Sequence, residues 1–131
     1  MVKDALAYQI IGCAMRVHNQ LGPGFQEVIY QRCLAIELDK VDLSFTREKE
    51  HDIYYDGIQV GTRRADFVIK NEIVVEIKAL VKLEEVHLAQ PKNYTVAYDF
   101  TRVLLINFGG KSLEYKLLFN PKYQNQNSQN C

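Results

Sequence analysis

Residues 45–79 contain three β-rich segments that are joined by very short turns. The segments Phe45 to Tyr55, Ile58 to Ile69 and Ile73 to Ala79 show the two-residue alternation of strands. The turns between them are Asp56-Gly57 and Lys70-Asn71-Glu72. Because parallel neighbours need a crossover of about a dozen residues, turns this short connect antiparallel strands. The sequence therefore predicts an antiparallel three-strand meander.

The rest of the chain predicts helices before and after this meander, and two further strands. Apolar residues at helical spacing indicate the helices, and largely apolar runs indicate the strands. The predicted helices cover 2–20, 25–40 and 83–98, and the predicted strands cover 103–108 and 113–119. Pro91 interrupts the third helix. Since such helices can cover both faces of a mixed sheet, we expect an α/β fold with three layers, α/β/α.

The composition is that of a globular protein. The chain has 131 residues, of which 47% are hydrophobic and 24% are charged, and this length fits one domain. We expect the domain to span residues 1–119, followed by a frayed, Asn- and Gln-rich tail over 120–131. Sixteen basic and sixteen acidic residues give zero net charge, so binding of nucleic acid by bulk charge alone is not predicted.

The cysteines and the apolar runs favour a cytoplasmic protein. Cys13, Cys33 and Cys131 lack metal-ligand spacing, and any single disulfide would leave one of them unpaired. No run approaches the roughly 18 apolar residues that span a membrane. The segment Ile10-Ile11-Gly12-Cys13 is similar to a lipoprotein cleavage site, but Asp4 falls in the would-be basic leader and the apolar stretch is short. We therefore interpret this segment as part of an amphipathic helix.

Two charged residues interrupt the apolar segment Ile73 to Ala79. On a strand, Glu76 and Lys78 point to the same side, about 7 Å apart. Charged groups in such an apolar strand carry a desolvation cost. The pair therefore forms either a structural salt bridge, a wet face of an edge strand, or part of a functional site.

Asp66 favours the functional interpretation. It lies in the preceding strand, where it shares a face with Arg64 and Val68. Asn71 is at the centre of the turn, and Asp66 and Glu76 lie at equal sequence distances on either side of it. The tight turn then brings the two carboxylates together. Two carboxylates and a lysine on one sheet face are typical of a site for Mg²⁺, which binds through one or two carboxylates and keeps water. The lysine can orient the attacking water and offset developing charge.

A third carboxylate comes from the second predicted helix. Glu27 lies in line with the apolar stripe that includes Tyr30, where a solvated glutamate is not expected. The alternative is a first-turn glutamate that complements the helix dipole, and both interpretations stay open. In the third predicted helix, Gln90 and Tyr94 lie four residues apart on one face, which by itself is usual for a surface hydrogen bond.

Together these residues resemble a known family. Five elements in order are similar to those of the GxxExxY family, which belongs to the PD-(D/E)XK nuclease superfamily and has a restriction-endonuclease-like fold. The resemblance runs from about Ile10 to Phe119. Its elements are Gly24…Glu27…Tyr30, Arg64-Ala65-Asp66-Phe67, Val75-Glu76-Ile77-Lys78-Ala79, Gln90…Tyr94 and Leu105-Ile106-Asn107-Phe108-Gly109.

The resemblance implies a metal centre. Asp66 and Glu76 would be the metal-binding carboxylates, Lys78 the catalytic lysine, and Glu27 the helix-borne acid that assists the metal. The backbone carbonyl of Ile77 would be a further ligand. The cofactor implied is Mg²⁺ or Mn²⁺.

The resemblance also implies residues that support the site or contact nucleic acid. These are Gln90, Tyr94 and Tyr30. Pro91 departs from the pattern, because proline disfavours the helical conformation of the residue before it, and this puts the role of Gln90 in doubt.

The function expected from these residues is metal-dependent hydrolysis of phosphodiester bonds, with DNA as the expected substrate. A noncatalytic module for nucleic-acid binding or assembly is the alternative, and a structural domain with a buried ion-pair cluster is a third. A complete Asp…Glu-x-Lys set favours the enzyme. No membrane partner is expected, whereas a homodimer or a protein partner would help so small and neutral a chain to hold its substrate. Scattered basic residues could line a phosphate track if they rim the acidic site: Arg16, Arg47, Lys49, Arg63, Arg64, Lys82 and Lys92.

Overall fold

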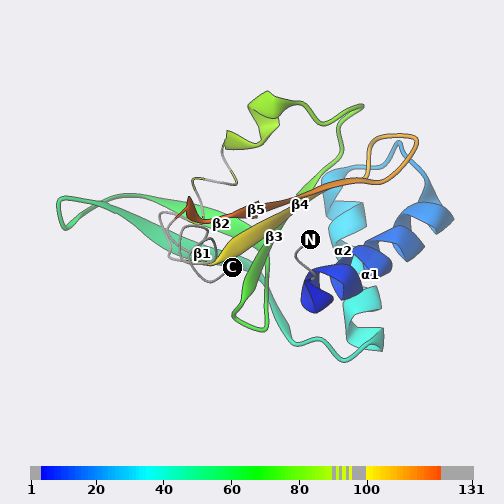
Figure 1. Ribbon diagram of the computed structural model, residues 1–131, viewed down its shortest axis with the longest axis horizontal. Helices are drawn as coiled ribbons and strands as arrows, with labels where there is room; N and C mark the ends of the chain where they lie inside the picture. Colours follow the sequence, from blue (N-terminus) through cyan, green and yellow to red (C-terminus); the bar gives the residue numbers. More distant parts are fainter. Residues whose placement is uncertain (1–3, 90, 92, 94, 96–99, 122–131) are drawn as a thin grey trace, which may run out of the picture.

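The computed structural model of the chain describes residues 4–89, 91, 93, 95 and 100–121. Two long helices lie beside one twisted sheet (Figure 1). The helices are α1 (Ala5–Leu21) and α2 (Glu27–Lys40), with a short 3₁₀ helix η1 (Glu85–His87). The strands are β1 (Phe45–Tyr55), β2 (Ile58–Ile69), β3 (Ile73–Lys78), β4 (Arg102–Asn107) and β5 (Glu114–Phe119).

The sheet has five strands in the order β1-β2-β3-β4-β5. The pairs β1–β2, β2–β3 and β4–β5 are antiparallel, whereas β3 and β4 are parallel. The predicted meander and the mixed α/β sheet are therefore confirmed. Because β3 pairs only with the last residues of β2, from Phe67 to Ile69, most of β1 and β2 continues as a two-stranded arm, which projects from the body in Figure 1.

Turn chemistry fixes the register of the meander. Asp56 and Gly57 both have positive φ, 52° and 76°, as a type I′ hairpin turn requires. Lys70 and Asn71 also have positive φ, 54° and 55°, and the Glu72 N–H donates to the Ile69 carbonyl across them at 3.0 Å. The turns end β1 and β2 where the sequence predicts, although the β1–β2 register shifts by one residue between Ile53 and Tyr54.

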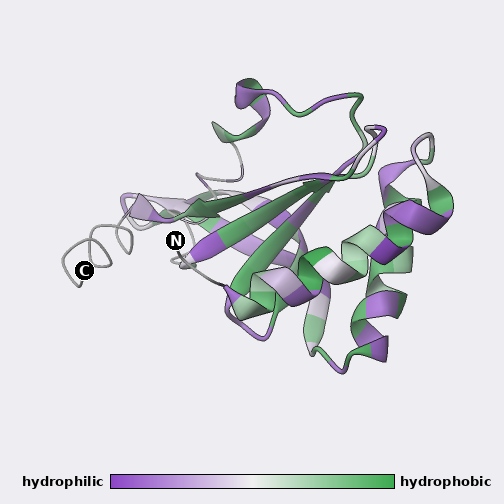
Figure 2. Ribbon diagram, turned by 45° about the vertical axis from the view of Figure 1, so that its right-hand side comes forward, coloured by the Kyte–Doolittle hydropathy of each residue, from purple (hydrophilic) through white to green (hydrophobic). Residues whose placement is uncertain are grey.

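Helices α1 and α2 cover one face of the sheet. Buried residues from both helices and from alternate positions of β2, β3 and β4 form the main core. Figure 2 shows the hydrophobic colour of the central strands beside the helices. The largest fully buried side chains include Tyr30, Phe67, Phe108, Ile10, Leu34, Leu38, Ile69, Ile73, Ile77, Leu104 and Leu105.

The opposite face of the sheet carries a smaller cluster. Ala65, Val68, Val74 and Val103 are buried there, and two partly buried residues, Phe100 and Leu118, pack against them. Asn120, the first residue of the predicted tail, is buried as well and donates a side-chain hydrogen bond to the Thr95 carbonyl at 3.0 Å. The remainder of the predicted tail, from residue 122, lies outside the described residues.

The predicted third helix differs at its start. Glu84 is extended and its N–H donates to Nδ1 of His87 at 2.9 Å, so the segment begins with the 3₁₀ turn η1. Residues 89, 91, 93 and 95 are helical, and Pro91 is among them. Of the helices in the described part of the chain, none is long and apolar enough to cross a membrane.

A buried asparagine holds the chain where it leaves β3. Asn107 accepts from the Leu80 N–H at 2.7 Å and donates to the Leu80 carbonyl at 2.9 Å. Gly109 lies against the same segment, where a Cβ atom would come within 2.3 Å of the Leu80 carbonyl oxygen. These contacts fix the backbone immediately after Lys78.

Tyr30 joins the helix-connecting loop to the core. Its ring is fully buried and stacks on Phe108, with ring centroids 4.8 Å apart. Its hydroxyl donates to the Gly22 carbonyl at 2.6 Å and accepts from the Phe25 N–H at 3.2 Å. One phenol therefore ties α2 to the loop before it and to the end of β4.

We predict that Tyr30→Phe lowers the free energy of unfolding by about 1–3 kcal/mol, because two partly buried backbone groups lose their partner. Urea denaturation measures this difference. Tyr8→Phe is the matched control, since Tyr8 is 60% exposed and the same change should cost little. Equal losses in the two variants would contradict the role of the Tyr30 hydroxyl.

Candidate active site

The structure brings together the sequence-predicted residues on α2, β2 and β3. Asp66 accepts a hydrogen bond from the Ile77 N–H at 2.7 Å, so its carboxylate lies directly against β3. The charges of Asp66 and Lys78 both act on Glu76, and both also act on Glu27 across the gap to α2. Four charged side chains from three elements therefore share one centre.

Asp66 occupies the point where β2 and β3 separate. The last residue pair between these strands is Phe67 with Val75. In a continuous ladder, the Ile77 N–H would donate to a backbone carbonyl of β2. Here it donates to the Asp66 side chain instead. The other Asp66 oxygen accepts from Gln31 on α2 at 3.2 Å.

The prediction that Asp66 shares a face with Arg64 and Val68 is wrong. Ala65 packs with Val68 on the far face of the sheet, whereas Asp66 reaches α2, so the alternation shifts at this point. Beyond the shift, the side chain of Arg63 lies 3.8 Å from the Glu76 carboxylate, while Arg64 is exposed. At this point the Asp66 side chain replaces a ladder bond to β3, and on β1 the residue between the partners of Phe67 and Ala65, Glu48, has a positive φ of 52°.

Glu76 is a buried carboxylate with unsatisfied bonding capacity. It is 7% exposed, and its Oε1 atom has no hydrogen-bond partner among the described residues. Burial and the negative charge of Asp66 raise the pKa of Glu76 to about 8, although Arg63 and Lys78 oppose the shift. An oxygen in this state is suited to a cation, because a cation would stabilise the ionised form.

Glu27 faces the same centre from the first turn of α2. Desolvation raises the pKa of Glu27, Lys78 opposes this effect, and Asp66 reinforces it. A hydrogen bond with the backbone of Ala79 also favours the ionised form. Glu27 is thus oriented toward the end of β3, as the functional interpretation of this residue requires.

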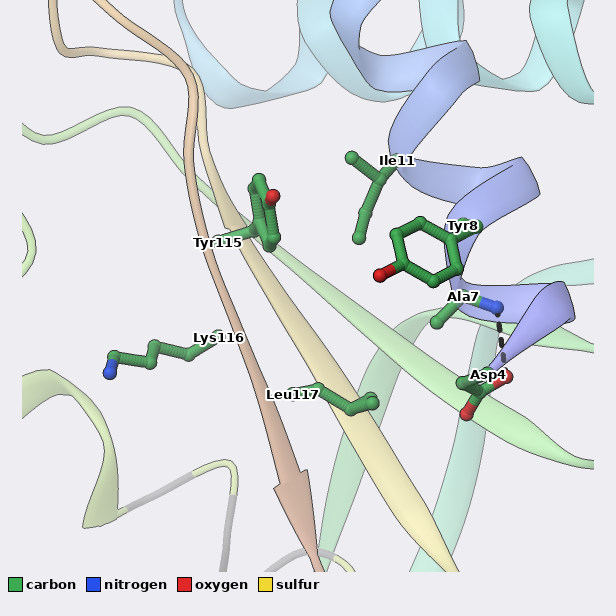
Figure 3. Close-up of a pocket in the computed structure, with 7 residues that line it drawn as sticks. All are labelled: Asp4, Ala7, Tyr8, Ile11, Tyr115, Lys116 and Leu117. Carbon is green, nitrogen blue, oxygen red and sulfur yellow. Dashed lines mark hydrogen bonds between the residues drawn. The ribbon is translucent and has the colours of Figure 1, made fainter. Parts of the chain in front are cut away.

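A small polar cavity lies between α2 and the separating strands. Its volume is about 180 Å³, enough for a hydrated cation. The residues that line it are Glu27, Val28, Gln31, Glu48, Asp66 and Ile77. Another hollow, of about 210 Å³, lies between α1 and β5 (Figure 3). Its one carboxylate, Asp4, already pairs with Arg102. The polar cavity is the candidate site because Glu27 and Asp66 of the charged centre line it.

One predicted residue, Tyr30, does not join this centre. Tyr30 is fully buried, so it supports the loop before α2 and has no surface for nucleic acid. Gln90 and Tyr94 lie outside the described residues.

Two further residues belong to the centre: Gln31, which the sequence patterns did not single out, and Arg63, which was expected only among the basic residues of a phosphate track. Gln31 is 6% exposed, donates to Asp66, and accepts from Arg47 on β1 at 2.7 Å. Its signal was its position four residues after Glu27, which places both on one helix face. Arg63 reaches Glu76 only because of the shifted alternation.

A mixed sheet with an aspartate at a strand separation, and Glu-x-Lys on the next strand, defines a restriction-endonuclease-like protein. The model of the PD-(D/E)XK nuclease superfamily matches residues 4–117. The chain therefore belongs to the PD-(D/E)XK nuclease superfamily. Members of this superfamily are generally nuclease hydrolases, which implies a nucleic-acid substrate, and they typically use divalent metals.

The comparison with solved structures concerns the fold alone. The crystal structure of SSO0001 matches with a TM-score of 0.50 and 15% sequence identity, over 91% of this chain and 79% of that chain. No curated protein matches the chain.

The donor set at the centre fits a hard divalent cation. Within the described residues, no three Asp, Glu, His or Cys side chains form a complete metal-binding group. A magnesium site needs only one or two carboxylates, with water and substrate oxygens as the other ligands. Asp66 and Glu76 meet this requirement, because they are adjacent and one Glu76 oxygen lacks a hydrogen bond.

We predict that the metal-free protein loses stability as the pH rises from 4.5 to 8, the interval between the ordinary pKa of Glu76 and its folded-state value of about 8. In this interval the Glu76 carboxyl is ionised in the unfolded chain but stays protonated in the folded protein. Glu76 therefore lowers the free energy of unfolding by at most about 1.4 kcal/mol for each pH unit of increase. Urea denaturation in EDTA across this range measures it.

Glu76→Gln should remove this slope, because the amide does not titrate. Glu50→Gln, an exposed strand glutamate, is the matched control and should keep the slope of the unmodified protein. A Glu76→Gln variant with an unchanged slope would show that Glu76 is not the titrating group.

Proposed function

We propose that this chain is a Mg²⁺- or Mn²⁺-dependent nuclease that hydrolyses phosphodiester bonds of DNA. The observation that carries the proposal is the buried Glu76 oxygen without a hydrogen bond, next to Asp66 at the separation of β2 and β3. Such an oxygen is costly to leave unsatisfied, and a bound cation would satisfy it. Superfamily membership supports the same chemistry.

In this proposal Asp66 and Glu76 hold the cation, and the Ile77 carbonyl and Glu27 complete its protein ligands. When bound, the cation would polarise the phosphodiester and lower the pKa of a water molecule. Lys78 is the catalytic lysine: its ammonium orients the attacking water by donating to its oxygen, and offsets charge on the phosphate oxygens. Gln31 holds the Asp66 carboxylate in place.

Within the superfamily, we propose membership of the GxxExxY family. Each residue of that pattern has a physical role in this fold. Gly24 has φ of 110°, which residues with side chains rarely adopt. Glu27 faces the acidic centre, and the Tyr30 hydroxyl holds the loop that contains Gly24.

The proposal includes a cytoplasmic location and a second copy or a protein partner that extends the substrate-binding surface. Free thiols at Cys13 and Cys33 are compatible with a reducing compartment. The zero net charge supports the need for added surface. Gel filtration with light scattering, with and without a DNA duplex, tests the oligomeric part.

We predict that the double variant Asp66→Asn/Glu76→Gln loses Mn²⁺ binding, because the amides cannot replace the two anionic ligands. Isothermal titration calorimetry measures the binding. The variant should remain folded, since removing two adjacent negative charges relieves repulsion in the metal-free protein. Asp52→Asn/Glu50→Gln, an exposed pair on β1, is the control and should bind as the unmodified protein does. Equal Mn²⁺ affinity in the two double variants would refute the site.

We predict that Lys78→Met lowers the cleavage rate by at least about 100-fold, because the attacking water loses its positioning group. Mn²⁺ affinity should stay the same or increase, since a competing cation is gone. The measurements are cleavage of labelled DNA and RNA of one and two strands, together with calorimetry. Lys116→Met, on the exposed face of β5, is the control.

Cleavage by Lys78→Met at the rate of the Lys116→Met variant would refute the catalytic role. A buried structural salt bridge with Glu76 would instead predict a loss of about 3–5 kcal/mol in stability with metal present. Binding of nucleic acid by the unmodified chain without any cleavage would favour the noncatalytic module.

A further inference from the structure

A further hollow lies at the ends of the two parallel strands, β3 and β4. Three connecting segments line it: the loop before α2, the residues after β3, and the loop between β4 and β5. In Figure 1 the loop after β4 lies beside the connection between α1 and α2. We call this hollow, of about 470 Å³, the loop pocket, and its lining includes Pro23, Val81, Lys82, Lys111, Ser112 and Glu114.

The loop pocket adjoins the acidic centre through a short stretch of chain. Val81 follows Lys78 by three residues, so their Cα atoms are at most about 11 Å apart. Between them, the backbone of Ala79 has a hydrogen bond with Glu27 of the centre. Each nucleotide of a strand advances about 3.4 Å along the axis of a duplex. A strand with one phosphodiester at the centre therefore reaches the loop pocket within about three nucleotides.

Hydrogen bonds and close packing hold the walls of the loop pocket in place. The His18 ring donates to the Gly110 carbonyl at 2.9 Å, which ties the loop after β4 to α1. Gly109 packs directly against Leu80 of the segment after β3. A Cβ atom at Gly110 would lie 3.4 Å from the carbonyl oxygen of Val81. Because these contacts fix both segments, a ligand would meet a preformed surface, which lowers the entropic cost of binding.

The charged residues of the loop pocket favour an anion. Two lysines, Lys82 and Lys111, and one carboxylate, Glu114, line it, which leaves one net positive charge. Both lysines are exposed, and neither has a hydrogen bond or a close ion pair in the part of the chain that the structure describes. Lys82 acts on Glu114 only through its charge. The two ammonium groups are therefore available to donate hydrogen bonds to phosphate.

The carboxylate of Glu114, the one acidic side chain among the described residues of this lining, is already engaged. Its Oε1 atom accepts from the Leu83 N–H at 3.0 Å and from the Asn107 side chain at 2.9 Å. These two hydrogen bonds, that of Asn107 first, lower the pKa of Glu114. Glu84 and Glu85 line a neighbouring hollow that shares Glu114. Glu114 thus reduces the positive charge of the loop pocket without closing it.

We propose that the loop pocket binds the nucleotide strand next to the phosphodiester that is cleaved, with Lys82 and Lys111 donating to its phosphate oxygens. Val81, which is 91% exposed, and Pro23 supply an apolar surface for a sugar or a base. The volume of the pocket is in the range of small-molecule sites, about 300–1,000 Å³, so it can hold one nucleotide. The inference rests on the proposed function and names the surface that holds the substrate beside the centre.

Oligonucleotide binding tests this proposal without turnover. Fluorescence anisotropy with a labelled DNA single strand and a labelled duplex is measured in Ca²⁺, a hard cation that oxygen ligands also bind. With the tighter-bound of the two, Lys82→Met/Lys111→Met should weaken binding about tenfold and lower the salt dependence by about one phosphate contact. Lys40→Met/Lys116→Met is the charge-matched control, because both lysines are exposed and lie outside the loop pocket, and it should change the affinity less than threefold.

A charge change at Val81 tests the same surface without altering the lysines. Val81→Asp should bind about fivefold more weakly than Val81→Asn, because the two side chains are nearly equal in size and only aspartate repels phosphate. Both variants should fold, since Val81 is 91% exposed. Equal affinities of the two variants would show that no phosphate lies beside Val81 and would overturn the proposal.

Kinetics separate the loop pocket from the reacting centre. In Mg²⁺, Lys82→Met/Lys111→Met should raise KM about tenfold and leave kcat within about threefold, because contacts away from the reacting phosphate stabilise the ground state and the transition state alike. Its Ca²⁺ affinity without nucleic acid, measured by calorimetry, should equal that of Lys40→Met/Lys116→Met. A lower kcat with unchanged KM would place the effect at the reacting centre and overturn the proposal.

The failure of this inference differs from the failure of the proposed function. Equal binding by the two double-lysine variants, in a protein that cleaves DNA, overturns the role of the loop pocket alone. An unmodified protein that binds DNA but never cleaves it refutes the nuclease, and the binding ratio of the two variants still decides whether the pocket holds phosphate. A protein that binds neither oligonucleotide overturns both.

Light scattering tests a different occupant of the loop pocket, a second copy of this chain. The proposal expects Val81→Asp to keep the oligomeric state of the unmodified protein. If Val81→Asp instead dissociates an oligomer and keeps the oligonucleotide affinity of Val81→Asn, the pocket is a contact between copies, which overturns the proposal.

Discussion

The hydrogen bond from the Ile77 N–H to Asp66, 2.7 Å long, is the contact on which the candidate site depends. It replaces a backbone pair at the position where β2 leaves β3, and so ends the ladder without leaving a buried donor unsatisfied. The exchange holds one carboxylate against β3 beside Glu76. It also turns the preceding chain, which places Ala65 on the far face and Arg63 next to Glu76.

Much of the fold was predictable because local chemistry decides it. The Asp56-Gly57 turn and the short turn after Ile69 leave only one simple connection, and the strand boundaries of the meander follow from them. The convergence of Asp66 with Glu76 was predictable for the same reason, since a fixed turn fixes the register.

The rest depends on contacts that no periodic pattern contains. The two-residue alternation of a strand assumes a continuous ladder, and it therefore predicted that Asp66 shares a face with Val68. The alternation fails here, because the Asp66 side chain replaces a backbone hydrogen bond of the ladder. Gln31 resembles any polar helix residue until α2 packs on the sheet. The 3₁₀ start of the third helix depends on a Glu84–His87 cap, which competes locally with the predicted helix.

The site also has a consequence for the order in which the chain folds. Asp66, Glu76 and Lys78 belong to one hairpin, so their approach closes a very short loop, whereas Gln31 reaches Asp66 from 35 residues away. Loop-closure entropy favours the local contacts first. Asp66 and Glu76 would therefore repel each other as soon as the hairpin forms. Arg63, on the same hairpin, supplies a positive charge beside Glu76 that reduces this repulsion. On this argument, we expect α2 to dock after the hairpin has brought Asp66 and Glu76 together.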